Sequence, residues 1–195
     1  MSNEILKRKD RSEYSANSIH TLSGNILDLD NPSKEDMRLD DIVTGISREC
    51  RFSNQTLFPY SVAQHSVLVH DLVLEATGDF NLSYAALLHD AHEAYVRDLA
   101  SPMKTTCNRY CEVEDTVQGE VLRFFDCKMN IMTKTVVKTY DKLALEIELA
   151  HFWPDRYDLP EGYEDIELEV LSESDARLGF IQTLFEYRED LVDGE

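Results

Sequence analysis

Two histidines of this chain are each followed directly by an aspartate, a dipeptide that can offer a nitrogen and a carboxylate to one centre. They are His70-Asp71 and His89-Asp90. The first lies where an apolar helical stripe gives way to polar residues, so we predict that it lies on the surface. The second follows the strongly apolar run 84–88, which predicts that it lies at the edge of a buried helix face.

Another histidine and another carboxylate follow His89-Asp90 closely in the sequence. Glu93 follows His89 by four positions, so in a continuous helix the two side chains share nearly the same face. His92 lies between them and is open to three interpretations: an extra ligand, a proton shuttle, or a neighbour without a role. We favour the neighbour.

Two other predicted helices supply side chains of the same chemistry. His65 lies on an apolar stripe, and Asp141 lies beside the apolar side of a long helix. A buried carboxylate without a partner is strongly unfavourable or becomes protonated, so Asp141 needs a partner. His65, His89, Asp90 and Asp141 together form a donor set that suits Mn²⁺, Fe²⁺, Co²⁺ or Zn²⁺ better than Ca²⁺. The sequence therefore predicts a divalent metal site.

Four segments around these residues resemble the HD-domain phosphohydrolase superfamily. Within it they are most similar to YfbR-type 5'-deoxynucleotidases and to small phage-encoded HD proteins that include dATP triphosphohydrolases. The segments are 60–66 (YSVAQHS), 85–95 (AALLHDAHEAY), 98–104 (DLASPMK) and 138–141 (KTYD), and the similarity extends from about residue 29 to residue 150.

The resemblance implies a role for each matched residue. It assigns His65, His89, Asp90 and Asp141 as metal ligands. Glu93 would orient or deprotonate the attacking water. Asp98 would assist at the leaving group or hold the water network around the metal.

The resemblance also implies a set of substrate contacts. Arg51 and Lys104 would contact phosphate, Phe52 would lie near the sugar or base, and Lys138 is a further candidate for phosphate. Elementary chemistry agrees, because phosphoester hydrolysis needs a metal, a carboxylate that manages a proton, and cations that offset the anionic substrate.

The expected function is a metal-dependent phosphohydrolase, assembled as a homo-oligomer, that removes 5'-phosphates from deoxynucleotides. Two substrates stay open, namely dNMPs or dATP. We lean to dATP because residues 50–52 and 60–66 look most like the phage-type proteins, which implies control of the dATP pool. The alternatives are a catalytically silent nucleotide-binding module, and an acidic protein whose tail recruits a partner.

Apolar periodicity predicts an all-α fold, a bundle of about six or more helices, because no long β-type alternation recurs. Asp40 and Asp41 are expected to cap a helix to about residue 50, and Ser61 to cap a second that ends at Gly78. Further helices are expected at about 82–96, 108–125, 133–150 and from 172. The last would carry Leu178, Ile181 and Phe185 on one face, which would be either part of the core or an interface with another copy of the chain. Residues 19–30 form either a small hairpin or an irregular segment.

The chain divides into a loose arm (1–18), a phosphohydrolase domain (19–153) and an acidic segment with a final helix packed on the domain (154–195). The net charge is −19, and residues 155–195, with 14 acidic and 3 basic residues, contribute −11 of it. So acidic a surface repels nucleic acid and anionic membranes.

The start of the chain and its cysteines bear on location. The first residues are polar, no apolar stretch approaches the length of a membrane span, and four cysteines lack zinc-knuckle spacing. We therefore expect a reduced, cytoplasmic protein, in the host cytoplasm if a phage encodes it.

Overall fold

The fold is a helical bundle, as expected. The computed structural model describes residues 15–188 and contains 57% helix and 5% strand, which confirms the all-α class. The helices in this part of the chain are α1 (Leu39–Arg48), α2 (Val62–Thr77), α3 (Phe80–Leu87), α4 (Glu93–Val96), α5 (Ser101–Lys104), α6 (Asn108–Phe124), α7 (Ile131–Phe152) and α8 (Glu173–Phe185). Among residues 15–188, no helix is both long and apolar enough to cross a lipid bilayer.

A small antiparallel hairpin precedes the helices. Strands β1 (Ser18–His20) and β2 (Ile26–Asp28) pair with each other, which decides between the two expectations for residues 19–30. Two short 3₁₀ turns, η2 (Lys34–Asp36) and η3 (Phe52–Asn54), lie before and after α1. The predicted N-terminal arm falls largely on residues 1–14, outside the described residues.

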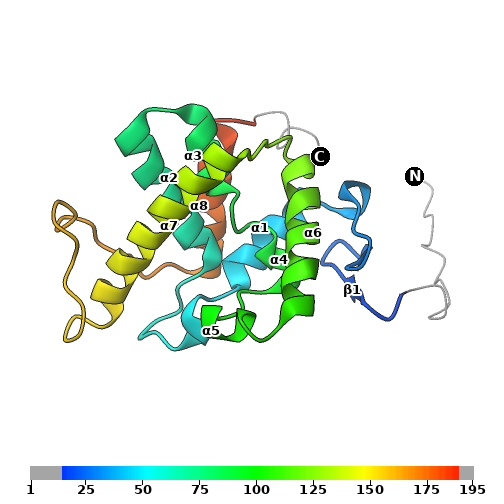
Figure 1. The fold of residues 1–195 in the computed structure, drawn as a ribbon, viewed down its shortest axis with the longest axis horizontal. Helices are drawn as coiled ribbons and strands as arrows, with labels where there is room; N and C mark the ends of the chain where they lie inside the picture. Colours follow the sequence, from blue (N-terminus) through cyan, green and yellow to red (C-terminus); the bar gives the residue numbers. More distant parts are fainter. Residues whose placement is uncertain (1–14, 189–195) are drawn as a thin grey trace.

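Helix α2 is the centre of the bundle and packs against α3, α7 and α8 (Figure 1). One core joins β2, α1, the start of α2, the end of α3, α6 and α8. A second core joins α2, α3 and α7. The end of α3 therefore contributes to both cores, and the His89-Asp90 dipeptide follows it directly.

Both ends of α2 follow the predicted signals. The hydroxyl of Ser61 accepts from the backbone N–H of Gln64, and the Gln64 side chain accepts from the backbone N–H of Ser61. Gly78 ends the helix with φ of 61°, a left-handed conformation that a glycine adopts without strain.

The helix expected at 82–96 is interrupted. Helix α3 starts at Phe80 with Asp79 as its cap and ends at Leu87, residues 88–92 form turns, and α4 starts at Glu93. In a continuous helix the carbonyl of Ala86 would accept from the N–H of Asp90. Here it accepts from the ring Nδ1 of His89 at 2.7 Å and from the backbone N–H of the same residue at 3.4 Å, and the bond to the side chain competes with the bond that would continue the helix.

Two further helix predictions were wrong in detail. Helix α1 begins at Leu39 without a side-chain cap, because the carboxylate of Asp41 is buried and accepts from the N–H and hydroxyl of Ser23 in the hairpin. Helix α8 buries Ala176, Phe180 and Leu184, whereas Leu178 is 52% exposed, so the face with Leu178, Ile181 and Phe185 is not the one that forms the core. Helix α8 has apolar residues on several sides, and its contacts with α1 and α2 decide which of them is buried.

A close approach between α1 and α4 fixes the position of the residues that follow His89. A Cβ placed on Gly45 would lie 2.6 Å from the Cβ of Ala94 and 2.9 Å from its Cα. Because Ala94 follows Glu93 directly, Gly45 sets how closely α4 packs on α1.

We predict that Gly45→Ala lowers the free energy of unfolding by about 1–3 kcal/mol, because two helices must separate to admit a methyl group. Gly119→Ala in α6 is the matched control, since a Cβ there meets nothing within 4 Å. It should raise stability by up to about 1 kcal/mol. Urea unfolding of both variants checks this, and equal effects would contradict the packing argument.

Candidate metal centre

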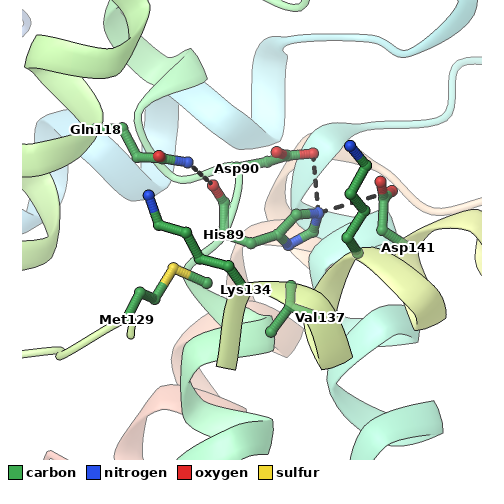
Figure 2. Close-up of a pocket in the computed structure, with 8 residues that line it drawn as sticks. His89, Asp90, Gln118, Met129, Lys134, Val137 and Asp141 are labelled. Atoms are coloured by element: carbon green, nitrogen blue, oxygen red, sulfur yellow. Dashed lines mark hydrogen bonds and ion pairs between the residues drawn. The ribbon is translucent and has the colours of Figure 1, made fainter. Parts of the chain in front are cut away.

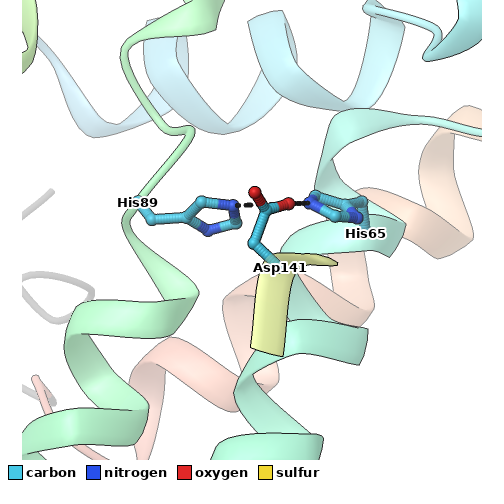
Figure 3. A group of neighbouring side chains, drawn as sticks. All are labelled: His65, His89 and Asp141. Atoms are coloured by element: carbon cyan, nitrogen blue, oxygen red, sulfur yellow. Dashed lines mark ion pairs between the residues drawn. The ribbon is translucent and has the colours of Figure 1, made fainter. Parts of the chain in front are cut away.

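Four side chains from three segments converge at one point. His65 comes from α2, His89 and Asp90 from the turn after α3, and Asp141 from α7. The Nε2 of His65 lies 3.2 Å from Asp141 and 3.6 Å from Asp90. The Nε2 of His89 lies 3.1 Å from Asp90 and 3.8 Å from Asp141. Figure 3 shows both rings directed at the Asp141 carboxylate from opposite sides.

The other nitrogen of each ring fixes its orientation. Nδ1 of His89 lies 2.7 Å from the carbonyl of Ala86, and because a carbonyl only accepts, this nitrogen carries the proton. Nδ1 of His65 lies 2.7 Å from the carboxylate of Glu148. In the neutral rings Nε2 is therefore the unprotonated nitrogen that can bind a metal.

These residues fit a divalent metal. Both Nε2 atoms are fully buried and have no hydrogen-bond partner, although carboxylate oxygens lie close by. Ligand atoms about 2.1 Å from one ion stand roughly 3.0–3.5 Å from each other, which is close to the separations measured here. His65, His89 and Asp141 thus form a buried cluster that could hold a metal ion, with Asp90 beside it.

The charges of the cluster support each other. Burial disfavours the charged imidazole of His89, but Asp90 and Asp141 outweigh it and raise its pKa well above the ordinary value. Burial likewise opposes ionisation of Asp90 and Asp141, and the neighbouring imidazoles more than offset it and lower both pKa values. A proton or a cation is thus favoured between these groups.

Glu148 belongs to the site, although the sequence did not indicate it. It is fully buried, and one of its carboxylate oxygens lies 2.7 Å from Nδ1 of His65. The other oxygen accepts two hydrogen bonds from the guanidinium of Arg51, at 2.9 and 3.1 Å. Burial opposes its ionisation, but His65 and Arg51 lower its pKa. Its spacing of seven residues after Asp141, two turns along the same face of α7, was the available signal.

Most of the predicted substrate contacts and acids line one cavity of about 330 Å³ beside the cluster, which we call the α5-side cavity. It contains Arg51, Phe52, Glu93, Asp98 and Lys104 together with Asp90 and Asp141. Glu93 reaches it from the first turn of α4, not from a helix shared with His89.

Two acids in the α5-side cavity have shifted pKa values. Burial, then the charges of Asp90 and Asp98, raise the pKa of Glu93 well above its ordinary value, and its Oε2 is buried without a partner. Burial also raises the pKa of Asp98, against the opposing effect of Arg51. Carboxyl groups tuned upward in this way suit proton transfer near neutral pH.

Lys138 lies apart from the other predicted contacts, in a second cavity of about 150 Å³ that we call the α7-side cavity. Figure 2 shows this cavity with His89, Lys134 and Asp141 among the residues that line it. The cavity shares His89, Asp90 and Asp141 with the cluster. Lys134 and Gln118, which the sequence did not single out, complete its polar lining, and Gln118 donates to the backbone carbonyl of His89 at 3.0 Å.

The prediction for His70 was wrong. It is 2% exposed, with Nδ1 2.7 Å from Asp71 and Nε2 2.8 Å from the hydroxyl of Tyr187. Tyr187, which follows α8, packs against the His70 ring, and nothing near His70 in the sequence indicates this contact. Asp71 itself is exposed, as expected.

His92 is a buried neighbour of the metal cluster. Its Nε2 lies 3.6 Å from Glu114 of α6, and His92, Glu93 and Glu114 are close enough to hold an ion. The ammonium of Lys104, however, already lies 2.7 Å from Glu114 and supplies positive charge there.

Comparison with known proteins gives two relatives. No family model matches the chain. It is 32% identical over 143 residues to the uncharacterized protein YfdR of Escherichia coli strain K12, a match that covers 70% of this chain and 76% of that protein. It is 34% identical over 134 residues to the uncharacterized protein RCAP_rcc00048 of Rhodobacter capsulatus, which covers 65% of this chain and 68% of the relative.

We predict that Glu148→Gln weakens divalent metal affinity about 10–100-fold, because the charge that holds the His65 ring is lost. Isothermal titration with Mn²⁺ or Zn²⁺ measures the change. Glu146→Gln, an exposed change on the same helix, is the control and should leave the affinity as it is. Equal affinities in both variants would show that Glu148 does not support the site.

Metal binding should also release a proton. The raised pKa of His89 means that its Nε2 carries a proton in the metal-free protein up to a higher pH than usual, and metal binding displaces it. Metal affinity therefore rises with pH until the pH passes that pKa. Calorimetry at pH 7 in two buffers of different ionisation enthalpy counts the protons, and identical heats in both would refute the displacement.

Proposed function

The chain belongs to the protein family that includes YfdR and RCAP_rcc00048, and we propose that it is a metal-dependent phosphohydrolase of the HD-domain type. Its substrates are deoxynucleotides, from which it removes the 5'-phosphate or phosphates. The observation that carries this proposal is the convergence of two oriented imidazoles and two carboxylates beside a cavity that holds both acids and cations.

The donor set suits a divalent ion such as Mn²⁺, Co²⁺, Zn²⁺ or Fe²⁺, held by His65, His89, Asp90 and Asp141. Such an ion, when bound, lowers the pKa of water and polarises a phosphoryl oxygen. The protein supplies the remaining parts of the chemistry.

Glu93 is the proposed acceptor of the proton from the attacking water. Its carboxyl is buried, faces the α5-side cavity and has a raised pKa, which matches a general base that works near neutral pH. The oxygen of water bonds to phosphorus, the bond from phosphorus to the 5' oxygen breaks, and that oxygen takes up a proton. Asp98, whose pKa is also raised, is the proposed donor of that proton.

Arg51, Lys104 and Phe52 hold the substrate in this proposal. The guanidinium of Arg51 lies 3.9 Å from Asp90 and is fixed by Glu148, so it faces the phosphate position without rearrangement. Phe52 follows Arg51 and packs edge to face against Phe152 and Trp153. Its ring lines the α5-side cavity and is an apolar surface for the sugar or base of the substrate.

The choice of dATP, converted to deoxyadenosine, rests on the resemblance of residues 50–52 and 60–66 to the phage-type proteins. Control of the dATP pool would be the consequence in the cell. The acidic surface is compatible with a small anionic substrate because the positive charge is gathered at the site.

We predict that Asp90→Asn reduces deoxynucleotide hydrolysis at least about 100-fold, because it removes a ligand of the metal. The assay measures deoxynucleoside, phosphate and polyphosphate released from dNMPs and dNTPs with each of Mn²⁺, Co²⁺, Zn²⁺ and Fe²⁺. Asp71→Asn is the matched control, since it changes the aspartate of the other His-Asp dipeptide, outside the site. It should retain wild-type activity.

Metal analysis separates failure of the site from failure of the activity. Metal lost from Asp90→Asn together with its activity supports the proposal. An absence of turnover in the wild-type protein with all four metals would refute the phosphohydrolase.

A further inference from the structure

A further cavity, of about 400 Å³, lies between the hairpin, α4 and α6 (Figure 1). We call it the hairpin-side cavity. It shares no lining residue with the α5-side cavity or the α7-side cavity. Its volume falls within the range of roughly 300–1,000 Å³ that is typical of small-molecule sites.

One part of the lining is apolar. It consists of four half-buried aliphatic side chains that pack against the first core and of two tyrosine rings. These are Ile19, Leu29, Val96 and Val113 with Tyr95 and Tyr110. A large apolar group placed in the cavity is therefore removed from water by side chains that the core already holds in place.

Two opposite charges lie side by side in the same lining. The guanidinium of Arg109 donates to one carboxylate oxygen of Asp30, and the amide of Asn17 donates to the other at 2.6 Å. The side chains of Arg109 and Asp30 are 65% and 36% exposed. An ion pair this exposed contributes little to stability, so a ligand that carries both charges can exchange partners with it at small cost.

The guanidinium has donors left for such a ligand. Within residues 15–188, two of its nitrogens are engaged, one by Asp30 and one by Glu112. A guanidinium carries five N–H groups, and it binds carboxylates through parallel hydrogen bonds.

An apolar surface beside a cation and an anion is complementary to a free α-amino acid with a large apolar side chain. The ligand carboxylate matches Arg109, its ammonium matches Asp30, and its side chain covers the apolar lining. The end of a peptide carries only one of these two charges. A nucleotide carries several negative charges, which Asp30 and Glu112 repel.

We propose that the hairpin-side cavity binds a free aromatic or branched aliphatic α-amino acid. This binding does not depend on the proposed function. The ligand lies against α4, because Tyr95 and Val96 belong to that helix, and the hydroxyl of Tyr110 donates to the carbonyl of Arg97 directly after it at 2.6 Å. Glu93 is the first residue of α4, so the bound amino acid restrains the helix that carries it.

Calorimetric titration of L-phenylalanine into the full chain tests the proposal. We expect saturable binding with a dissociation constant of about 1 mM or tighter. Phenethylamine lacks the carboxylate, 3-phenylpropionate lacks the ammonium, and L-alanine lacks the large side chain. Each should bind at least about tenfold more weakly, the effect of losing one charged contact or the apolar one.

The matched variants are Arg109→Gln and Arg123→Gln. The first should bind L-phenylalanine about tenfold more weakly. Arg123 is an exposed arginine of the same helix, paired with Glu120 and outside the cavity, so its variant should match wild type. Hydrogen exchange of the amides of residues 95–97 should slow when L-phenylalanine is added to wild type.

Three results would overturn the inference. One is an absence of saturable binding, which includes the case of a second copy of the chain covering the cavity. Another is equal affinity for L-phenylalanine and its two singly charged analogues, which indicates an apolar site without charge recognition. The last is equal affinity of wild type and Arg109→Gln, or slower exchange confined to segments other than 95–97, which places the amino acid elsewhere.

Discussion

The site depends on how two imidazole rings are held. In each ring Nδ1 faces an acceptor, a backbone carbonyl for His89 and a buried carboxylate for His65, so Nε2 is left with a lone pair. Both Nε2 atoms are buried without a hydrogen-bond partner, an arrangement that is costly unless a cation or proton is shared with the nearby carboxylates. The interruption after α3 allows the His89 ring to bond to the Ala86 carbonyl, and the burial of Glu148 places its carboxylate against the His65 ring.

The same arrangement explains how an acidic chain can handle an anionic substrate. Two of the carboxylates at the site have a basic neighbour: the buried Glu148 has the guanidinium of Arg51, and the half-buried Asp90 has the imidazole of His89. Much of the negative charge lies elsewhere, in the segment after residue 154. The field that a nucleotide meets at the site is therefore set by a few local groups and not by the net charge of the chain.

Local signals in the sequence predicted most of the helices and singled out the residues that meet at the candidate metal centre. Ser61 and Gly78 marked the ends of α2 because caps involve residues only a few positions apart. His65, His89, Asp90 and Asp141 stood out because polar groups at the edges of apolar faces need partners, and the structure brings the four together. Contacts between distant residues were not predictable: Glu148 meets Arg51 across 97 positions and Tyr187 meets His70 across 117. The break after Leu87 was missed because a side chain takes the place of a backbone donor, which the apolar pattern does not reveal.

In the proposed site one divalent ion is bound by the two Nε2 atoms of His65 and His89 and by the carboxylates of Asp90 and Asp141. Anomalous diffraction from a crystal soaked in Mn²⁺ tests it most directly, because it locates the ion without relying on activity. We expect an anomalous peak about 2.0–2.3 Å from both Nε2 atoms. A peak confined to His92, Glu93 and Glu114, or none at His65 and His89, would contradict it.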